Sequence, residues 1–188
     1  WHIVAPDVYR SLNVLRSAHA DKRVFGHVLV LAGSASMPGA ALMSTLGALH
    51  SGAGLVTTLC PSSVINRIAG QVPEAMWRSL PQTHEGGLDV ESVRVVSQAA
   101  AKSSVLLVGP GMVMDRPTLF AVCRIIRENP LPLVLDASAL VQDVMTAILA
   151  RPASAGPVIL TPHHGEFSRI LGLKEEPPDD DSLLFGLS

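Results

Sequence analysis

The sequence places small, acidic and imidazole side chains directly after four separate apolar runs. Gly33 and Gly39 follow the first run, and Gly111, Asp136 and His163 follow the others in order. Glycine lets a ligand approach the backbone, whereas carboxylate and imidazole groups exchange hydrogen bonds with hydroxyls and phosphates. Parallel strands present their carboxyl ends at one edge of a sheet, where open α/β sheets bind ligands. We therefore expect these residues to form one site, with room for an anion.

The glycine turn lies in a predicted strand, turn and helix. Val28–Leu31 is an unbroken apolar run, which is typical of a strand buried on both faces, and Ala40–His50 has the pattern of a helix. Amides at the start of such a helix favour anions. Gly33 and Gly39 match neither the dinucleotide fingerprint nor a Walker A loop, so tight packing is an equal explanation for them. The expected inner stripe of this helix comprises Leu42, Leu46 and Leu49.

Composition restricts the fold and the partners of the chain. The 188 residues are 48% hydrophobic and 16% charged, which predicts one α/β domain over residues 1–188. The formal charge of −2 gives no electrostatic reason to expect nucleic acid or an anionic membrane as partner. Apolar runs are too short to span a bilayer, so we expect a cytoplasmic protein. Cys60 and Cys123 lack metal-site spacing and are expected to be free thiols.

The remaining sequence alternates predicted strands and helices, which is typical of a doubly wound parallel sheet. Further strands are expected around Ala75–Trp77 and at Val105–Val108, Leu133–Leu135 and Val158–Leu160. Further helices are expected from Pro61, from caps at Asp89 and Asp115, from Ser138, and over Phe167–Leu171. The helix capped by Asp89 is expected to carry Val90, Val93, Ser97 and Ala100 on one face. A short helix over 8–15, capped by Asp7, and a solvated loop or joint over 174–188 complete the prediction.

Four segments carry a resemblance to a known family. They are FGHVLVLAGSASMPGAALMSTLGALHSGAGLVTT, LLVGPGMVMD, PLVLDASAL and VILTPHHGEFSRILG, in the family's order. On these motifs the chain resembles the ADP- or ATP-dependent NAD(P)H-hydrate dehydratases, a branch of the ribokinase-like superfamily. The resemblance implies a three-layer α/β/α fold with a mostly parallel sheet. It also implies nucleotide-dependent dehydration of hydrated NADH and NADPH, through phosphoryl transfer and phosphate elimination.

The resemblance assigns roles to individual residues. It implies that Ala40, Gly111 and His163 contact the hydrated dinucleotide. The positions associated with the nucleotide, or with its Mg²⁺, are then Gly33, Gly39, Asp136 and Glu166; no side chain is expected to bind the metal directly. A helix cap is an alternative role for both His163 and Glu166. Further implied partners are a second copy of the chain and an epimerase, either fused or separate.

The sequence departs from the family at residues that bear on catalysis. Ser138 and Val141 stand where the family has a second aspartate and an asparagine. Nothing after Glu166 matches the Lys-Gly segment that contacts the nucleotide or the Gly-x-Gly-Asp that carries the catalytic aspartate. The catalytic residue is therefore unassigned, and we expect the C-terminal part of a longer protein to be missing. The alternatives are a ribokinase-like kinase for a small alcohol and a catalytically silent dinucleotide-binding relative.

Overall fold

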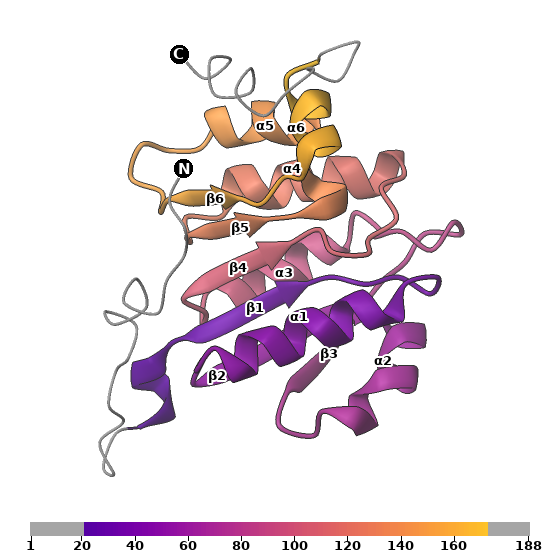
Figure 1. The fold of residues 1–188 in the computed structure, drawn as a ribbon, viewed down its shortest axis with the longest axis vertical. Coiled ribbons are helices and arrows are strands. Elements are labelled where there is room, and N and C mark those ends of the chain that lie inside the picture. Colours follow the sequence, from indigo (N-terminus) through magenta and orange to yellow (C-terminus); the bar gives the residue numbers. More distant parts are fainter. Residues whose placement is uncertain (1–20, 173–188) are drawn as a thin grey trace.

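A computed structural model describes residues 21–172, in which six parallel strands form one sheet in the order β3-β2-β1-β4-β5-β6 (Figure 1). The predicted helix over 8–15 and the predicted loop over 174–188 lie outside the described residues. The strands are β1 (His27–Leu31), β2 (Leu55–Pro61), β3 (Met76–Leu80), β4 (Val105–Val108), β5 (Leu133–Leu135) and β6 (Val158–Leu160).

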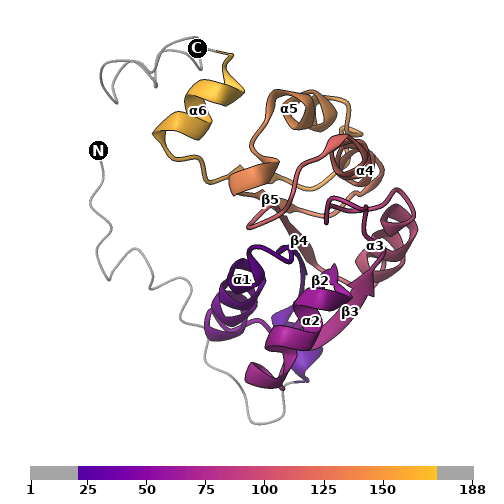
Figure 2. The same cartoon turned by 90° about the vertical axis from the view of Figure 1, so that its right-hand side faces the viewer.

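Helices cover both faces of the sheet, so the predicted three-layer α/β/α architecture is confirmed. Figure 2 shows α1 and α2 on one side of the strands and α3, α4 and α5 on the other. The helices are α1 (Pro38–His50), α2 (Ser62–Ile68), α3 (Ser92–Ala100), α4 (Arg116–Glu128), α5 (Gln142–Leu149) and α6 (His164–Ile170). Short 3-10 turns occupy Lys22–Phe25, Ala69–Gln71 and Ala137–Ala139.

The central strand β1 belongs to two hydrophobic clusters. Leu29 and Leu31 pack into the cluster beneath α3, α4 and α5, whereas Val30 and Ala32 pack into the cluster beneath α1 and α2. This division explains why the run is apolar at every position rather than at alternate ones. The sequence prediction of a strand buried on both faces is therefore confirmed.

The predicted stripe of α1 flanks the buried face of the helix instead of forming its centre, since Leu42 and Leu49 pack against the cluster that contains Val30. Ala41 and Thr45 are the fully buried residues of this helix, whereas Leu42, Leu46 and Leu49 are only half-buried. The Thr45 hydroxyl donates to the Ala41 carbonyl and lies 2.6 Å from the Thr58 hydroxyl, so its polarity is satisfied against the sheet. Small side chains allow the helix to approach the strands closely, which a ranking by hydrophobicity does not anticipate.

Two other helices begin or face differently from the prediction. α3 begins at Ser92, where Val93 and Val96 are buried while Ser97 is exposed, so the predicted face was rotated. The helix expected from Ser138 begins instead at Gln142, because residues 137–139 form a separate 3-10 turn. The predicted cap of α4 is confirmed, since the Asp115 carboxylate accepts from the Thr118 N–H at 2.9 Å.

The described sheet ends in a strand with little apolar cover. β6 pairs with β5 on one side, and Ile159 and Leu160 are 57% and 37% exposed. On the opposite margin, β3 pairs only with β2 among the described strands. Apolar side chains at the β6 end therefore remain in contact with solvent in this part of the chain.

Candidate binding site at the carboxyl ends of the strands

The chain reverses its direction of winding between β1 and β4, which creates a crevice where their carboxyl ends meet. The two loops that leave these strands are joined by main-chain hydrogen bonds. The Gly33 N–H donates to the Pro110 carbonyl at 2.7 Å, and the Gly109 N–H donates to the Leu31 carbonyl at 3.1 Å. The glycine turn and the Gly109-Pro110-Gly111 loop therefore form one continuous rim.

Gly111 and Ala40, predicted to contact the same ligand, lie against each other. Gly111 is buried with φ of 66°, and a Cβ at this position would collide with the Cβ of Ala40. Its N–H has no hydrogen-bond acceptor within the described part of the chain. Because buried N–H groups are rarely left unpaired, this donor is available for a ligand oxygen.

The two glycines of the turn have different structural roles. Gly33 is buried with φ of 84°, and an added Cβ would lie 2.7 Å from the Cβ of Ala41, so this glycine permits tight strand-to-helix packing. Gly39 is exposed in the first turn of α1, and no atom lies within 4 Å of the position that its Cβ would take. The packing explanation therefore fits Gly33, whereas open space for a ligand exists at Gly39.

A residue that sequence reasoning missed holds the glycine turn in place. Arg67 on α2 donates from Nη1 to the Ala35 carbonyl at 2.9 Å. Within the turn, the buried Ser34 hydroxyl lies 3.0 Å from the Ser36 hydroxyl and accepts from the Met37 N–H at 3.3 Å. No sequence signal links Arg67 to the turn, because the two are far apart along the chain and arginines on exposed helix faces are common.

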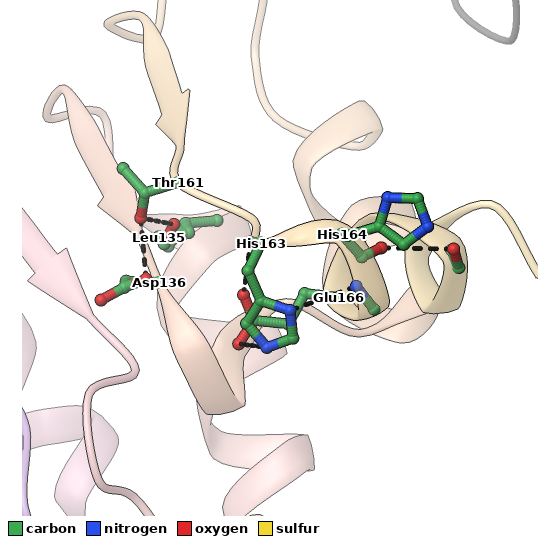
Figure 3. Close-up of polar contacts among 8 residues, drawn as sticks. Leu135, Asp136, Thr161, His163, His164 and Glu166 are labelled. Atoms are coloured by element: carbon green, nitrogen blue, oxygen red, sulfur yellow. Dashed lines mark hydrogen bonds and ion pairs between the residues drawn. The ribbon is translucent and has the colours of Figure 1, made fainter. Parts of the chain in front are cut away.

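Asp136 lies at the end of β5, where it ties three strand ends together. The Thr161 hydroxyl donates to Asp136 Oδ1 at 2.8 Å and approaches the Leu135 carbonyl at 3.3 Å (Figure 3). Ser138 donates from its hydroxyl to the Met112 carbonyl at 2.9 Å, which fixes the loop after β4. Ala137 between them has φ of 50°, a left-handed conformation that alanine rarely adopts. This strain marks the β5 end as a tightly determined part of the rim.

His163 and Glu166 form a reciprocal cap at the start of α6. The Gly165 N–H donates to His163 Nδ1 at 3.1 Å, and the His163 N–H donates to Glu166 Oε2 at 3.0 Å. Glu166 Oε1 also lies 3.4 Å from His163 Nε2, so the carboxylate orients the imidazole (Figure 3). The helix-cap alternative is thus present for both residues.

The His163 side chain remains accessible in spite of these contacts. It is 71% exposed, whereas that of Glu166 is 11% exposed. Figure 3 shows the His164 ring directed away from this pair. His163 does not contact Ala40 or Gly111 in the described structure. His163 follows β6, which lies two strands from β4, so roughly 10 Å separates His163 from Gly111 across the sheet.

The described residues contain no group of three or more His, Cys, Asp or Glu side chains that could hold a metal ion. Both oxygens of Glu166 already interact with His163. Asp136 uses Oδ1 toward Thr161, and its second oxygen has no hydrogen-bond partner in residues 21–172. A cation at this rim would therefore need most of its ligands from a bound molecule or from water.

Asp115 connects the rim to an adjoining loop. Its Oδ2 accepts from the Thr83 hydroxyl at 2.6 Å, which holds the segment before α3 against the start of α4. Burial raises the pKa of the Asp115 carboxyl, but hydrogen bonds from Thr118 and Thr83 outweigh burial and leave the pKa below 3.8. The carboxylate is therefore ionised at neutral pH, as a helix N-cap favours.

The parallel sheet, its layers and the glycine rim define a ribokinase-like α/β protein. A ribokinase-like protein from Enterococcus faecalis superposes with a TM-score of 0.78, at 22% identity, over 97% of this chain and 61% of that one. The structure of the ADP/ATP-dependent NAD(P)H-hydrate dehydratase from Bacillus subtilis, co-crystallised with ATP/Mg²⁺, superposes with a TM-score of 0.63. It is 33% identical to this chain, with 84% of this chain and 51% of that one covered.

The family model for NAD(P)H-hydrate dehydratase matches residues 28–184, so the chain belongs to that family. It is 35% identical over 159 residues to the ADP-dependent (S)-NAD(P)H-hydrate dehydratase of Bacillus subtilis, covering 84% of this chain and 51% of that protein. It is 34% identical over 168 residues to the bifunctional NAD(P)H-hydrate repair enzyme Nnr of Moorella thermoacetica, covering 89% of this chain and 32% of that protein. The chain thus spans about a third to a half of these relatives, and the resemblance seen in the sequence is confirmed.

Membership of the family leaves the individual site residues as predictions. The structure places Ala40 beside Gly111, positions Asp136 at the neighbouring strand end and leaves His163 accessible farther along the rim. Among the described residues, no helix is long and apolar enough to cross a membrane.

Proposed function

We propose that the protein to which this chain belongs dehydrates hydrated NADH and NADPH in a reaction that depends on ADP or ATP. The described residues would form the part of the site that holds the hydrated dinucleotide. The observation that carries this proposal is the pair of unpaired N–H groups at Gly39 and Gly111, on either side of Ala40, beside open space at the start of α1. The names of the relatives supply the reaction.

The first turn of α1 has the chemistry needed for an anionic group of the substrate. Met37 occupies the N-cap position without a side-chain hydrogen bond to the helix, and Pro38 provides no N–H. The Gly39 N–H therefore points outward unpaired, at the positive end of a 13-residue helix. A phosphate of the dinucleotide placed there would accept from Gly39 and from Gly111, while Ala40 is small enough to permit its approach.

His163 would bind a more distant part of the same substrate. Nδ1 accepts from the Gly165 N–H, so in the neutral ring Nε2 carries the proton; a substrate hydroxyl or phosphate oxygen would share this donor with Glu166 Oε1, which lies 3.4 Å from Nε2. Glu166 holds the ring in place from a nearly buried position. The separation of roughly 10 Å between His163 and Gly111 suits an extended dinucleotide rather than a small alcohol. This geometry favours the dehydratase over a small-molecule kinase.

The residues present do not by themselves fit ADP or ATP. The Lys-Gly and Gly-x-Gly-Asp segments that contact the nucleotide in the family have no counterpart in these 188 residues. We therefore assign no reaction step to a residue of this chain. Bound ADP or ATP would supply the phosphoryl group that turns the substrate hydroxyl into a leaving group. Asp136, whose second oxygen is unpaired in residues 21–172, is the candidate to meet water on nucleotide-bound Mg²⁺.

The alternative is a silent dinucleotide-binding protein. The intact mass of the native protein separates the two, because a mass well above 19.8 kDa would reveal the sequence that carries catalysis. We further propose a cytoplasmic homo-oligomer that works with an epimerase, either fused or separate; the relative from Moorella thermoacetica is named a bifunctional repair enzyme.

Recovery of NADH absorbance from its hydrate, with and without ADP or ATP, is the direct assay. The native protein should restore absorbance only when a nucleotide and Mg²⁺ are present. If it binds the hydrate without restoring absorbance, the silent-protein proposal replaces the dehydratase. If it neither binds nor converts the hydrate, both proposals fail.

A further inference from the structure

A second concave surface lies at the opposite, amino-terminal edge of the sheet. We call it the amino-edge groove; it consists of two adjoining hollows that share His27, Met76 and Lys102, the main one also lined by Thr57 and Arg78 and the second by Arg23. Its main hollow has a volume of about 720 Å³, which lies within the range of small-molecule sites. The length of β1 separates this groove from the glycine rim by about 15 Å.

The groove forms because α3 leaves part of one sheet face uncovered. Thr57 on β2 pairs in register with Met76 on β3, and both strands continue toward the edge of the sheet beyond the reach of α3. The C-terminal end of α3, from Gln98 to Lys102, forms the opposite wall. Met76 is 43% exposed on the floor, so the groove offers apolar surface to a ligand.

The charged groups of the groove all have the same sign. Arg23, Arg78 and Lys102 line it together with no carboxylate, and none of these three cations forms an ion pair within residues 21–172. Asp21, the nearest acid along the chain, uses its carboxylate to accept from the Arg23 N–H at 2.8 Å. Three cations that have no ion pair among the described residues, spread over two adjoining hollows, create a positive potential that favours an anion.

The end of α3 does not cancel this potential. The last carbonyls of a helix carry partial negative charge, which repels anions. Here, however, the Ala99 carbonyl accepts from the Lys102 N–H and the Ser103 hydroxyl, and the Ala100 carbonyl accepts from the Ser103 N–H. The Lys102 carbonyl lies 3.0 Å from His27 Nδ1. The helix end is therefore closed by hydrogen bonds.

His27 gives the groove a fixed shape. Its Nδ1 meets the Lys102 carbonyl, and its Nε2 lies 2.8 Å from the Thr57 hydroxyl. Both ring nitrogens are thus engaged, and the imidazole joins the base of β1 to the end of α3. His27 positions Lys102 rather than offering a free donor of its own.

We propose that the amino-edge groove binds a small organic phosphate. The cations would hold the phosphate, and the apolar floor at Met76 would hold the organic group. Arginine matches the geometry of phosphate oxygens, while lysine adds a point charge. This ligand site is independent of the proposed dehydration, because it shares no residue with the glycine rim.

Isothermal titration calorimetry tests the proposal. Phenyl phosphate and inorganic phosphate are titrated separately into the protein at constant ionic strength, and the heat of binding is recorded. We expect a saturable change with both probes and an affinity at least several-fold higher for phenyl phosphate, because only that probe covers the apolar floor.

Charge variants then locate the bound phosphate. R78Q/K102Q should weaken binding of phenyl phosphate by about tenfold or more, the effect of losing charged hydrogen bonds. R94Q/R127Q removes the same charge from exposed positions on α3 and α4 outside the groove and should change the affinity less than about twofold. Circular dichroism checks that each variant is folded. Equal losses in both double variants, equal affinities for the two probes, or no saturable change in folded protein would each overturn the proposal.

Discussion

Replacing Gly39 with valine separates the two explanations of the glycine turn. Gly39 lies in the first turn of α1 with no atom within 4 Å of its would-be Cβ, so a side chain there displaces solvent or a ligand and not protein. Valine is the better helix former of the two residues, so Gly39→Val should leave the free energy of unfolding unchanged or raise it by up to about 0.5 kcal/mol. Binding of the hydrated dinucleotide should nevertheless fall.

The size of this loss follows from the hydrogen bond that the ligand could no longer reach. Valine keeps the backbone N–H at the helix start, but its side chain would keep the ligand's charged oxygen from approaching that donor, and such a hydrogen bond contributes about 1.5–3 kcal/mol. We therefore expect affinity to fall by roughly 10- to 100-fold. Isothermal titration calorimetry with hydrated NADH or NADPH measures the affinity, and urea denaturation measures the stability.

Two matched substitutions calibrate the experiment. Gly47→Val lies on the same helix, exposed and equally unobstructed, about 12 Å farther along the axis, so it should leave binding unchanged. Gly33→Ala forces a left-handed φ of 84° on alanine and places its Cβ 2.7 Å from that of Ala41. It should destabilise the fold by about 2–5 kcal/mol. Wild-type affinity in Gly39→Val would refute a ligand at this turn.

Further predictions concern the cap of α6, the cap of α4 and the cysteines. His163→Ala should cost about 1 kcal/mol of stability by uncapping α6, whereas His163→Asn should retain the cap. Both variants should weaken dinucleotide binding by about 1–3 kcal/mol. If calorimetry shows full affinity in the asparagine variant, His163 acts only as a helix cap. Asp115→Ala should lower the free energy of unfolding by about 1 kcal/mol at neutral pH. The pKa of Asp115 is lowered in the folded state, so its contribution to the free energy of unfolding is present above the ordinary value of 3.8 and disappears as pH falls through the folded pKa. If the difference in unfolding free energy between variant and wild type stayed constant in acid denaturation, it would contradict this prediction. Burial raises the pKa of the Cys60 thiol to about 12, so iodoacetamide should modify Cys60 only on unfolding; labelling of Cys60 in folded protein, read by mass spectrometry, would show that β2 opens.

Four of the strands were predictable because each is a short, unbroken apolar run. β4, β5 and β6 have the bounds expected from their apolar runs, and β1 begins one residue earlier. The start of α5 was not predictable, because Ser138 donates its hydroxyl to Met112 and Ala137 adopts a left-handed conformation instead of continuing a helix. These are tertiary constraints with no local sequence signal.

The sequence indicated which residues would lie at the candidate site better than it indicated the role of each residue. The contact of Ala40 with Gly111 agrees with the family motifs, and the three-residue spacing of His163 and Glu166 is that of a reciprocal helix cap. The different roles of Gly33 and Gly39 could not be inferred, because the sequence does not show which glycine faces another backbone. Arg67 was missed because its partner is a main-chain carbonyl, which any sequence provides.

The central claim is that the glycine rim, which includes Gly39 and Gly111, together with His163 at the end of β6 holds a hydrated nicotinamide dinucleotide. Calorimetric titration of the 188-residue chain with hydrated NADPH tests it directly, with ADP and Mg²⁺ added afterwards while NADPH absorbance is followed. We predict saturable binding that Gly39→Val abolishes or weakens at least tenfold, and no recovery of absorbance, because no residue of this sequence matches the family's catalytic aspartate. Absence of binding by folded protein would contradict the assigned site, and rapid ADP-dependent recovery would show that Asp136 or Glu166 performs the catalysis that we place outside these residues.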